Sequence, residues 1–220
     1  MTLENIWVDN FEGYNFYNCM VDINNDIFKV KLKEIYESLK QKHIAEGKYT
    51  EENIKNNVVY DPSSYLEDFN IFSYPLPELH TLLKNIKKLL LSICEKENID
   101  IDLKQYYIHG WLNYFPVKMH EFRDYEEFYW HDHGTWEDCF HGYYAVNAEP
   151  STTHYRKNNV KLDRENKNGK LILARNGIEH AVGKWNLNEP RITIAYNLNP
   201  VSDAQKIHNS HMPNMLMPLI

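Results

Sequence analysis

A change in hydrophobic periodicity near residue 99 limits the fold more than any other feature of the sequence. Before this point, apolar residues recur at helical spacing over 25–46 and 79–98, which predicts two helices. After it, short alternating or apolar runs predict six strands, which span 107–115, 128–133, 140–147, 170–174, 178–183 and 191–198. Strands with no helical crossover between them are most often antiparallel. We therefore expect an all-β core closed into a sandwich or barrel, with both helices packed on one face.

The remaining segments give weaker predictions. Residues 1–24 have the pattern of strand and turn, whereas 48–76 and 148–168 are polar and lack periodicity. We expect loops in both, the second being a mobile loop or an insertion over a site. Asn25 or Asp26 is expected to cap the first helix, because such side chains accept hydrogen bonds from N–H groups of the first turn. The expected organisation is a single domain over 1–220, with a strand and helical buttress at 1–100, a β core at 105–198 and a C-terminal tail at 199–220.

Composition excludes some classes of partner. The formal net charge is −7 and the chain has no basic block, which argues against a nucleic-acid backbone as partner. No apolar run approaches the roughly 20 residues that span a bilayer, and Met1–Glu4 lacks the features of a signal peptide. Cys19, Cys94 and Cys139 are an odd number at unrelated spacings, which is typical of reduced thiols. We therefore expect a cytoplasmic protein that acts on a small or polar substrate.

A short histidine-rich segment, Trp130–Gly134, carries the strongest chemical signal. Side chains at i and i+2 of a strand share a face, so His131 and His133 would point the same way and Asp132 would point away. His180 lies on a later predicted strand. Imidazole ligates iron, zinc, copper and nickel, and three such ligands from two strands would leave open positions on a metal ion. The pattern therefore predicts a metal site.

Three arrangements can complete this site. The first uses all three histidines and needs no distortion of the strand, so we favour it. In the second, a β-bulge turns Asp132 inward and releases His133. In the third, Glu137 or Asp138 supplies a carboxylate from the turn that follows.

Arg191 is a second candidate site residue. It begins an apolar strand, and a guanidinium is costly to bury there without an anion. Arginine binds a carboxylate through two parallel hydrogen bonds. A carboxylate clamp beside a metal site suggests a bidentate oxo-acid as co-substrate. The alternative is a surface ion pair between Arg191 and Glu189 or Asp163.

Six segments of the chain follow one another in an informative order and spacing. They are Trp111–Asn113, Trp130–His133, His141–Val146, Gly169–Leu173, Ile178–Val182 and Arg191–Asn197. Together they resemble the 2-oxoglutarate/Fe(II)-dependent oxygenase superfamily, and most of all its small phage and marine-bacterial members with the pattern H-x-H…H…R-x-S/T. The resemblance covers roughly residues 105–198. His141 stands where Ser is usual, and His133 replaces the carboxylate of the better-known members.

The resemblance implies a double-stranded β-helix, a jelly-roll or cupin-like barrel with helices against one sheet. It implies Fe(II) held by His131, His133 and His180, with 2-oxoglutarate and O2 as co-substrates. It also implies that Arg191 binds the distal carboxylate of 2-oxoglutarate. Further residues expected to face the co-substrate or substrate are Tyr144, Thr193, Asn197, Asn113 and Trp111.

Only one of Tyr143 and Tyr144 can face the barrel interior, because side chains alternate along a strand. We favour Tyr144, since it shares a face with Gly142, whose small size would leave room for a cavity.

Three functional hypotheses follow. The leading one is a 2-oxoglutarate- and Fe(II)-dependent dioxygenase that hydroxylates an unidentified substrate. The second is a three-histidine, cupin-type dioxygenase or isomerase that does not use 2-oxoglutarate, in which Arg191 holds the carboxylate of the substrate itself. The third is a non-catalytic barrel that serves as a binding module.

Overall fold

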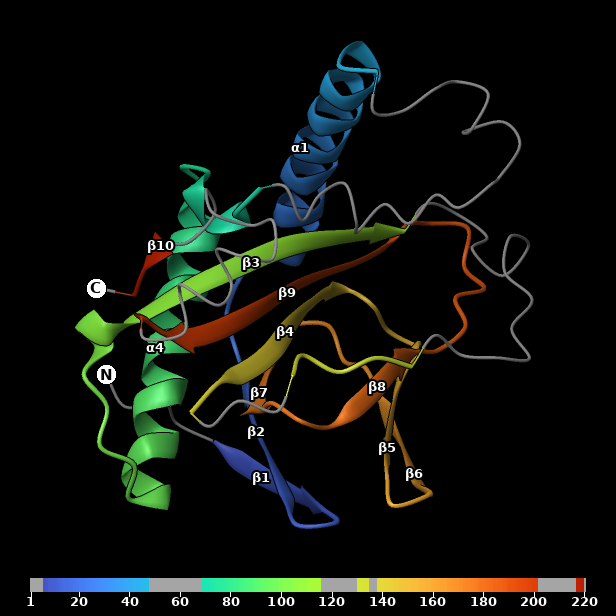
Figure 1. Cartoon of the computed structure of the whole chain (residues 1–220). Coiled ribbons are helices and arrows are strands. Elements are labelled where there is room, and N and C mark those ends of the chain that lie inside the picture. Colours follow the sequence, from blue (N-terminus) through green and yellow to red (C-terminus); the bar gives the residue numbers. More distant parts are fainter. Residues whose placement is uncertain (1–5, 48–68, 116–129, 135–137, 202–216, 220) are drawn as a thin grey trace.

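Two antiparallel β-sheets and two long helices make up the described part of the protein (Figure 1). The computed structural model describes residues 6–47, 69–115, 130–134, 138–201 and 217–219. The helical elements are α1 (Asn25–Ala45), α4 (Pro77–Glu97) and the 3-10 helices η1 (Ile71–Ser73) and η2 (Leu103–Gln105). The strands are β1 (Trp7–Phe11), β2 (Tyr14–Met20), β3 (Tyr106–Phe115), β4 (Phe140–Asn147), β5 (Thr152–Lys157), β6 (Val160–Glu165), β7 (Lys170–Arg175), β8 (Glu179–Val182), β9 (Arg191–Pro200) and β10 (Met217–Pro218).

The larger sheet has the strand order β1-β2-β7-β4-β9-β3-β10, and the smaller one has the order β6-β5-β8. From β3 onward the chain alternates between the sheets, because β4, β7 and β9 join the large sheet while β5, β6 and β8 join the small one. This arrangement confirms the predicted antiparallel β core with flanking helices, and it is compatible with a jelly-roll-like fold. No helix among the described residues is long and apolar enough to cross a membrane.

Both predicted helices are present, with small differences at their ends. The N-cap of α1 is Asn24 and not Asn25 or Asp26, because the Asn24 backbone is extended and its side chain accepts a hydrogen bond from the N–H of Ile27 at 3.2 Å. The side chain of Asn25 is engaged elsewhere, as acceptor from the hydroxyl of Tyr144. The second helix begins at Pro77, two residues before the predicted start, since proline is well accommodated in the first turn.

The helices cover one face of the large sheet. Tyr114 of β3 stacks on Tyr36 of α1 with ring centroids 4.2 Å apart, and Tyr144 of β4 lies 6.5 Å from Phe28 of α1. Other buried side chains of β3, β4 and β9 on this face are Ile108, Leu112, Phe140, Val146, Ile192, Ile194, Tyr196 and Leu198. These are all even-numbered positions, so strand alternation turns the odd-numbered side chains of β3, of β9 and of β4 as far as Ala145 to the opposite face. Beyond Ala145 the register of β4 shifts, and Asn147 pairs with Ile192.

Gly142 also lies on the helix-packed face and not on the inner one. A Cβ at this position would lie 2.0 Å from the carbonyl oxygen of Ile172 and 2.7 Å from the hydroxyl of Tyr196. The glycine therefore accommodates close packing within the core and leaves no room for a cavity.

The small sheet packs against part of the inner face of the large one. Phe16 of β2 and Tyr155 of β5 meet edge to face at 4.6 Å between centroids, within an apolar cluster that also contains Ile172 and Ala174 of β7. This cluster holds the two sheets together at the β2 and β7 side of the sandwich.

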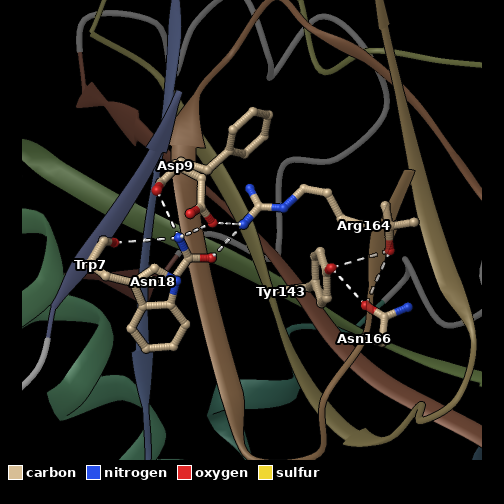
Figure 2. A network of polar contacts seen from close by, with 8 residues as sticks. Trp7, Asp9, Asn18, Tyr143, Arg164 and Asn166 are labelled. Carbon is tan, nitrogen blue, oxygen red and sulfur yellow. Dashed lines mark hydrogen bonds and ion pairs between the residues drawn. The ribbon is translucent and has the colours of Figure 1, made fainter. Parts of the chain in front are cut away.

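A buried arginine adds a polar link between the sheets. Arg164 of β6 reaches across to the carboxylate of Asp9 and to Asn18 Oδ1, the latter at 3.1 Å (Figure 2). Its guanidinium also lies 4.7 Å from the centroid of the Phe16 ring. Arg164 therefore has protein partners that account for its burial, and it ties β6 to β1 and β2.

The prediction of a loop at 148–168 is wrong, because β5 and β6 form a hairpin there. Its inward-facing residues mix the polar Thr153 and Arg164 with the apolar Tyr155 and Leu162, so the apolar alternation that marks a strand is weak in the sequence. The turn does carry a local signal. Asn158 and Asn159 both have positive φ, at 50° and 64°, and asparagine is among the residues that tolerate this conformation in tight hairpin turns.

Candidate metal centre

The segment that carries His131 and His133 is held by a single bridge. The N–H of His131 donates to the carbonyl of His180 at 3.1 Å, and the N–H of His180 donates to that of His131 at 2.8 Å. Residues 128 and 129 of the predicted strand lie outside the described residues, and 130–134 make only this isolated antiparallel bridge. The predicted strand is therefore reduced, in its described part, to one pairing with β8.

This pairing brings the three predicted histidine ligands together. One nitrogen from each of His131, His133 and His180 lies within 4.8 Å of the others. Nε2 of His133 and Nε2 of His180 are 3.3 Å apart. Two imidazole nitrogens that bind one metal ion at about 2.1 Å, with an angle between about 90° and 109°, are about 3.0–3.4 Å apart. The chemistry of the three donors therefore fits a shared metal ion, and the distance between His133 and His180 matches the spacing of two ligands of one ion.

The two carboxylate arrangements receive no support from the described residues. Asp132 is exposed, and its Oδ1 accepts a hydrogen bond from the N–H of Gly134 at 3.0 Å. Asp138 is exposed and lies 3.7 Å from Nη1 of Arg175. Glu137 lies outside the described residues. Among the residues that the structure describes, the group able to hold a metal consists of the three histidines.

Burial keeps the imidazoles of His133 and His180 neutral, which is the form that binds metal. It lowers the pKa of His133 and of His180 well below the ordinary value, and the neighbouring histidines lower both further. Nδ1 of His180 lies 3.4 Å from the carbonyl oxygen of Ile178. A proton on Nδ1 directed at that carbonyl leaves Nε2 as the ligating atom, as is usual for metal-bound histidine.

A fourth histidine, His141 of β4, lies beside the predicted ligands. Its ring is nearly parallel to those of His133 and His180, with centroids 5.1 Å and 5.3 Å away. Burial lowers the pKa of His141 to about 4. His141 stood out in the sequence only as a departure from the resembled pattern. The signal that places it here is its odd position on β4, which faces inward.

Arg191 lies on the same inner face, at the start of β9. It is only 2% exposed, so the alternative of a surface ion pair is wrong. Its Nε donates to Oγ of Ser151 at 2.9 Å, and its guanidinium lies 5.8 Å from the centroid of the Phe115 ring. Ser151, just before β5, was not identified from the sequence.

The preference for Tyr144 over Tyr143 is wrong. Tyr144 faces the helices, where its hydroxyl donates to Asn25 Oδ1 at 2.8 Å. Tyr143 lies on the inner face of β4, and its hydroxyl donates to Asn166 Oδ1 at 2.7 Å (Figure 2). Gly142 misled the prediction, because its missing side chain accommodates core packing.

Tyr143 is connected to Arg191 by a chain of hydrogen bonds. The hydroxyl of Thr153 donates to Tyr143 at 3.1 Å, and Nδ2 of Asn166 donates to Oγ of Ser151 at 3.0 Å. Ser151 in turn accepts from Arg191. These polar side chains form a continuous buried network that fixes the arginine from the side of the small sheet.

The remaining predicted residues also lie on the inner face. Nδ2 of Asn113 donates to Oγ1 of Thr193 at 3.3 Å, which links β3 to β9. The ring of Trp111 lies 5.7 Å from that of His133. Asn197 is paired in register with His141 of β4. Strand alternation predicted the inward positions of Thr193 and Asn197, whereas Trp111 and Asn113 were expected from the family resemblance.

The fold and site together define an antiparallel two-sheet protein with a partly buried candidate metal centre of three histidines. No protein-family model matches the sequence, and no curated protein matches it. A prolyl-4-hydroxylase from Pseudomonas putida is similar in structure, with a TM-score of 0.48 and 11% identity over 84% of this chain and 88% of that chain. A nickel complex of ThoJ, a non-haem monooxygenase, has a TM-score of 0.36 and 12% identity over 55% of this chain and 52% of that chain. Similarity at this level carries no functional argument.

Proposed function

We propose that this protein is a 2-oxoglutarate- and Fe(II)-dependent dioxygenase that hydroxylates an unidentified substrate. In this proposal His131, His133 and His180 hold the metal, and Arg191 binds the distal carboxylate of 2-oxoglutarate. The observation that carries it is the convergence of three histidine nitrogens within 4.8 Å beside the inner face of the large sheet, which also holds a buried arginine.

The chemistry of the ligand set supports a catalytic metal more than a structural one. Structural zinc sites are usually closed by four protein ligands, whereas catalytic metals keep open positions for substrate. The three imidazoles leave such positions, and 2-oxoglutarate needs two of them. When bound, Fe(II) would supply the oxidising chemistry with O2 and 2-oxoglutarate, while the protein supplies binding and orientation.

The surroundings of Arg191 support a role in binding the co-substrate. A carboxylate next to a guanidinium in a water-poor interior gains more from the charge than it would in water. The bond from Nε to Ser151 fixes the plane of the guanidinium. Tyr143, Thr153 and Asn166 fix Ser151 in turn, so that the arginine is held in one orientation before a ligand arrives.

The alternation of the chain between the two sheets supports a double-stranded β-helix as the detailed fold. In this proposal residues 105–198 form the catalytic core, with α1 and α4 as its buttress.

A second candidate function is a three-histidine dioxygenase or isomerase of the cupin type. The all-imidazole ligand set favours it, because the better-known 2-oxoglutarate enzymes carry a carboxylate at this position. Arg191 would then bind the carboxylate of the substrate directly.

Calorimetry under anaerobic conditions tests the leading proposal. We expect the Mn(II)-loaded protein to bind 2-oxoglutarate, the metal-free protein to bind it far more weakly, and Arg191→Met to lose at least tenfold in affinity. Arg175→Met is the matched control, because Arg175 pairs with Glu97 and Asp138 and should have no effect.

With Fe(II) and O2 present, the protein should convert 2-oxoglutarate to succinate. Metal binding without 2-oxoglutarate binding would favour the cupin-type function. A protein that binds no Mn(II), Fe(II) or Co(II) would contradict both candidates.

A further inference from the structure

We infer that Arg156 is a positioning residue for the candidate metal centre, although it lies on the outer face of the small sheet, away from the metal ligands. This inference rests on the proposed metal site. Arg156 acts on the two residues that directly precede His131 and His180 in the chain.

The contacts of Arg156 connect three separate segments. Its Nε donates to Oε2 of Glu179 at 2.9 Å and its Nη2 donates to Oε1 at 2.7 Å, which is a two-pronged ion pair. The centre of its guanidinium lies 4.5 Å from the centroid of the Trp130 ring. Arg156 on β5 is thus joined to β8 through Glu179 and to the histidine segment through Trp130.

Because side chains alternate along a strand, the contacts of Arg156 on the outer face also restrain the neighbouring residues that face inward. Tyr155 and His180 are cross-strand partners, as are Arg156 and Glu179 one position along. Trp130 and Glu179 point outward to Arg156, and their neighbours His131 and His180 point inward to the metal site. A guanidinium that holds the two outward side chains together therefore fixes the relative position of the two ligands that follow them.

The backbone supplies little of this restraint. The described part of the histidine segment makes one bridge to β8, in place of the ladder of hydrogen bonds that fixes a regular strand. Side-chain contacts must therefore supply the remaining restraint on the histidine segment. Arg156 contacts the segment on the outer face. Asn176 holds its other end, because its Nδ2 donates to the carbonyl of His133 at 2.9 Å.

An exposed ion pair contributes little to folding stability. The positioning role of Arg156 can therefore be distinguished from a role in stabilising the fold. The side chains of Arg156 and Glu179 are 33% and 44% exposed, a range in which ion pairs are largely screened by solvent. Loss of the Arg156 contacts should therefore change the affinity and geometry of the metal site more than the stability of the metal-free protein.

The test is a titration of the metal-free, full-length protein with Mn(II), combined with the absorption spectrum of the Co(II)-loaded form. We expect Arg156→Met to bind Mn(II) about tenfold more weakly than the wild type, the lower end of the range for residues that support metal ligands. The visible Co(II) bands should shift or weaken as well. Arg156→Lys keeps the charge and loses the two-pronged geometry, so it should recover only part of the affinity.

Lys161→Met is the matched control. Lys161 pairs with Arg156 in register on the same outer face, and its Nζ lies 5.8 Å from the Trp130 centroid. It should bind Mn(II) as the wild type does, and its metal-free form should unfold at the same temperature as that of Arg156→Met. If Arg156→Met does not fold, Glu179→Gln removes the same ion pair and should show the same loss.

Wild-type affinity in both Arg156→Met and Glu179→Gln would overturn the inference while leaving the proposed metal centre intact. Equal losses in Arg156→Met and Lys161→Met would also overturn it, since the effect would then be one of general charge. A wild-type protein that binds no Mn(II) would overturn the metal centre and this inference together.

Discussion

The adjacent tyrosines of β4 allow the assignment of its two faces to be tested with one chemical change. Tyr143→Phe and Tyr144→Phe each remove a single hydroxyl from neighbouring positions of one strand. The first hydroxyl belongs to the network that leads to Arg191, and the second is bonded to Asn25 of α1. We therefore expect the first variant to lose co-substrate affinity and the second to lose only stability.

The magnitudes follow from the hydrogen bonds that each change removes. Tyr144→Phe removes the 2.8 Å bond to Asn25, which is worth about 1 kcal/mol and corresponds to a fall in Tm of about 2–4 °C for a chain of this size. Tyr143→Phe removes bonds to Asn166 and Thr153, at a cost of about 1–3 kcal/mol in stability. If about 1.4 kcal/mol of this cost is lost from the free energy with which Arg191 binds a carboxylate, the affinity for 2-oxoglutarate falls about tenfold.

The assay is calorimetric titration of the Mn(II)-loaded variants with 2-oxoglutarate, with Tm measured in parallel by circular dichroism. Tyr144→Phe should match the wild type in affinity and serves as the control for the loss of a buried hydroxyl on the same strand. The reasoning fails if Tyr144→Phe loses as much affinity as Tyr143→Phe, or if Tyr143→Phe binds 2-oxoglutarate as tightly as the wild type.

Three further predictions concern packing, protonation and metal support. Gly142→Ala should destabilise the protein by at least about 2 kcal/mol in denaturant unfolding, because its Cβ would meet the backbone oxygen of Ile172 at 2.0 Å; unchanged stability would contradict the packing described for this face. Between about pH 6.5 and pH 4 the unfolded chain binds a proton that folded His141 does not, so the metal-free protein should become less stable as pH falls, by about 3 kcal/mol from His141 alone. His141→Gln should remove this share, while the contribution of His133 and His180 remains. Asn176→Ala should weaken Mn(II) binding about tenfold by freeing the carbonyl of His133, and a wild-type affinity would refute that support.

Most of the fold could be predicted because the strands of the large sheet face a helix-packed core. On β9, for example, Ile192 and Ile194 alternate with inward-facing Arg191 and Thr193, and such a pattern is visible in the sequence alone. The β5–β6 hairpin could not be predicted in this way, because Arg164 and Thr153 occupy positions where a core strand would carry apolar residues. Their burial depends on partners far away in the chain, such as Asp9.

The candidate ligands could be predicted because i, i+2 spacing is a local property. Their surroundings could not be predicted, since Ser151, which accepts from Asn166, reaches Arg191 only after the two sheets pack together. The preference for Tyr144 failed for a related reason. A glycine in a strand indicates that something approaches closely, and here the approaching groups are Tyr196 and the backbone of β7.

Side chains of β3, β4 and β9 alternate between two faces, and the two faces are under different functional constraints. Even-numbered positions such as Leu112, Tyr144 and Ile194 pack in the hydrophobic core, where almost any substitution lowers stability. Odd-numbered positions such as Asn113, Ala145 and Thr193 lie on the inner face, which the proposed function assigns to the co-substrate and substrate. A mutational library at the odd positions of these strands, with His141 and Arg191 retained, should therefore change ligand binding under the proposed function while the helix-packed core stays the same. In relatives of this chain, the odd-numbered positions of these strands should vary more than the even-numbered ones.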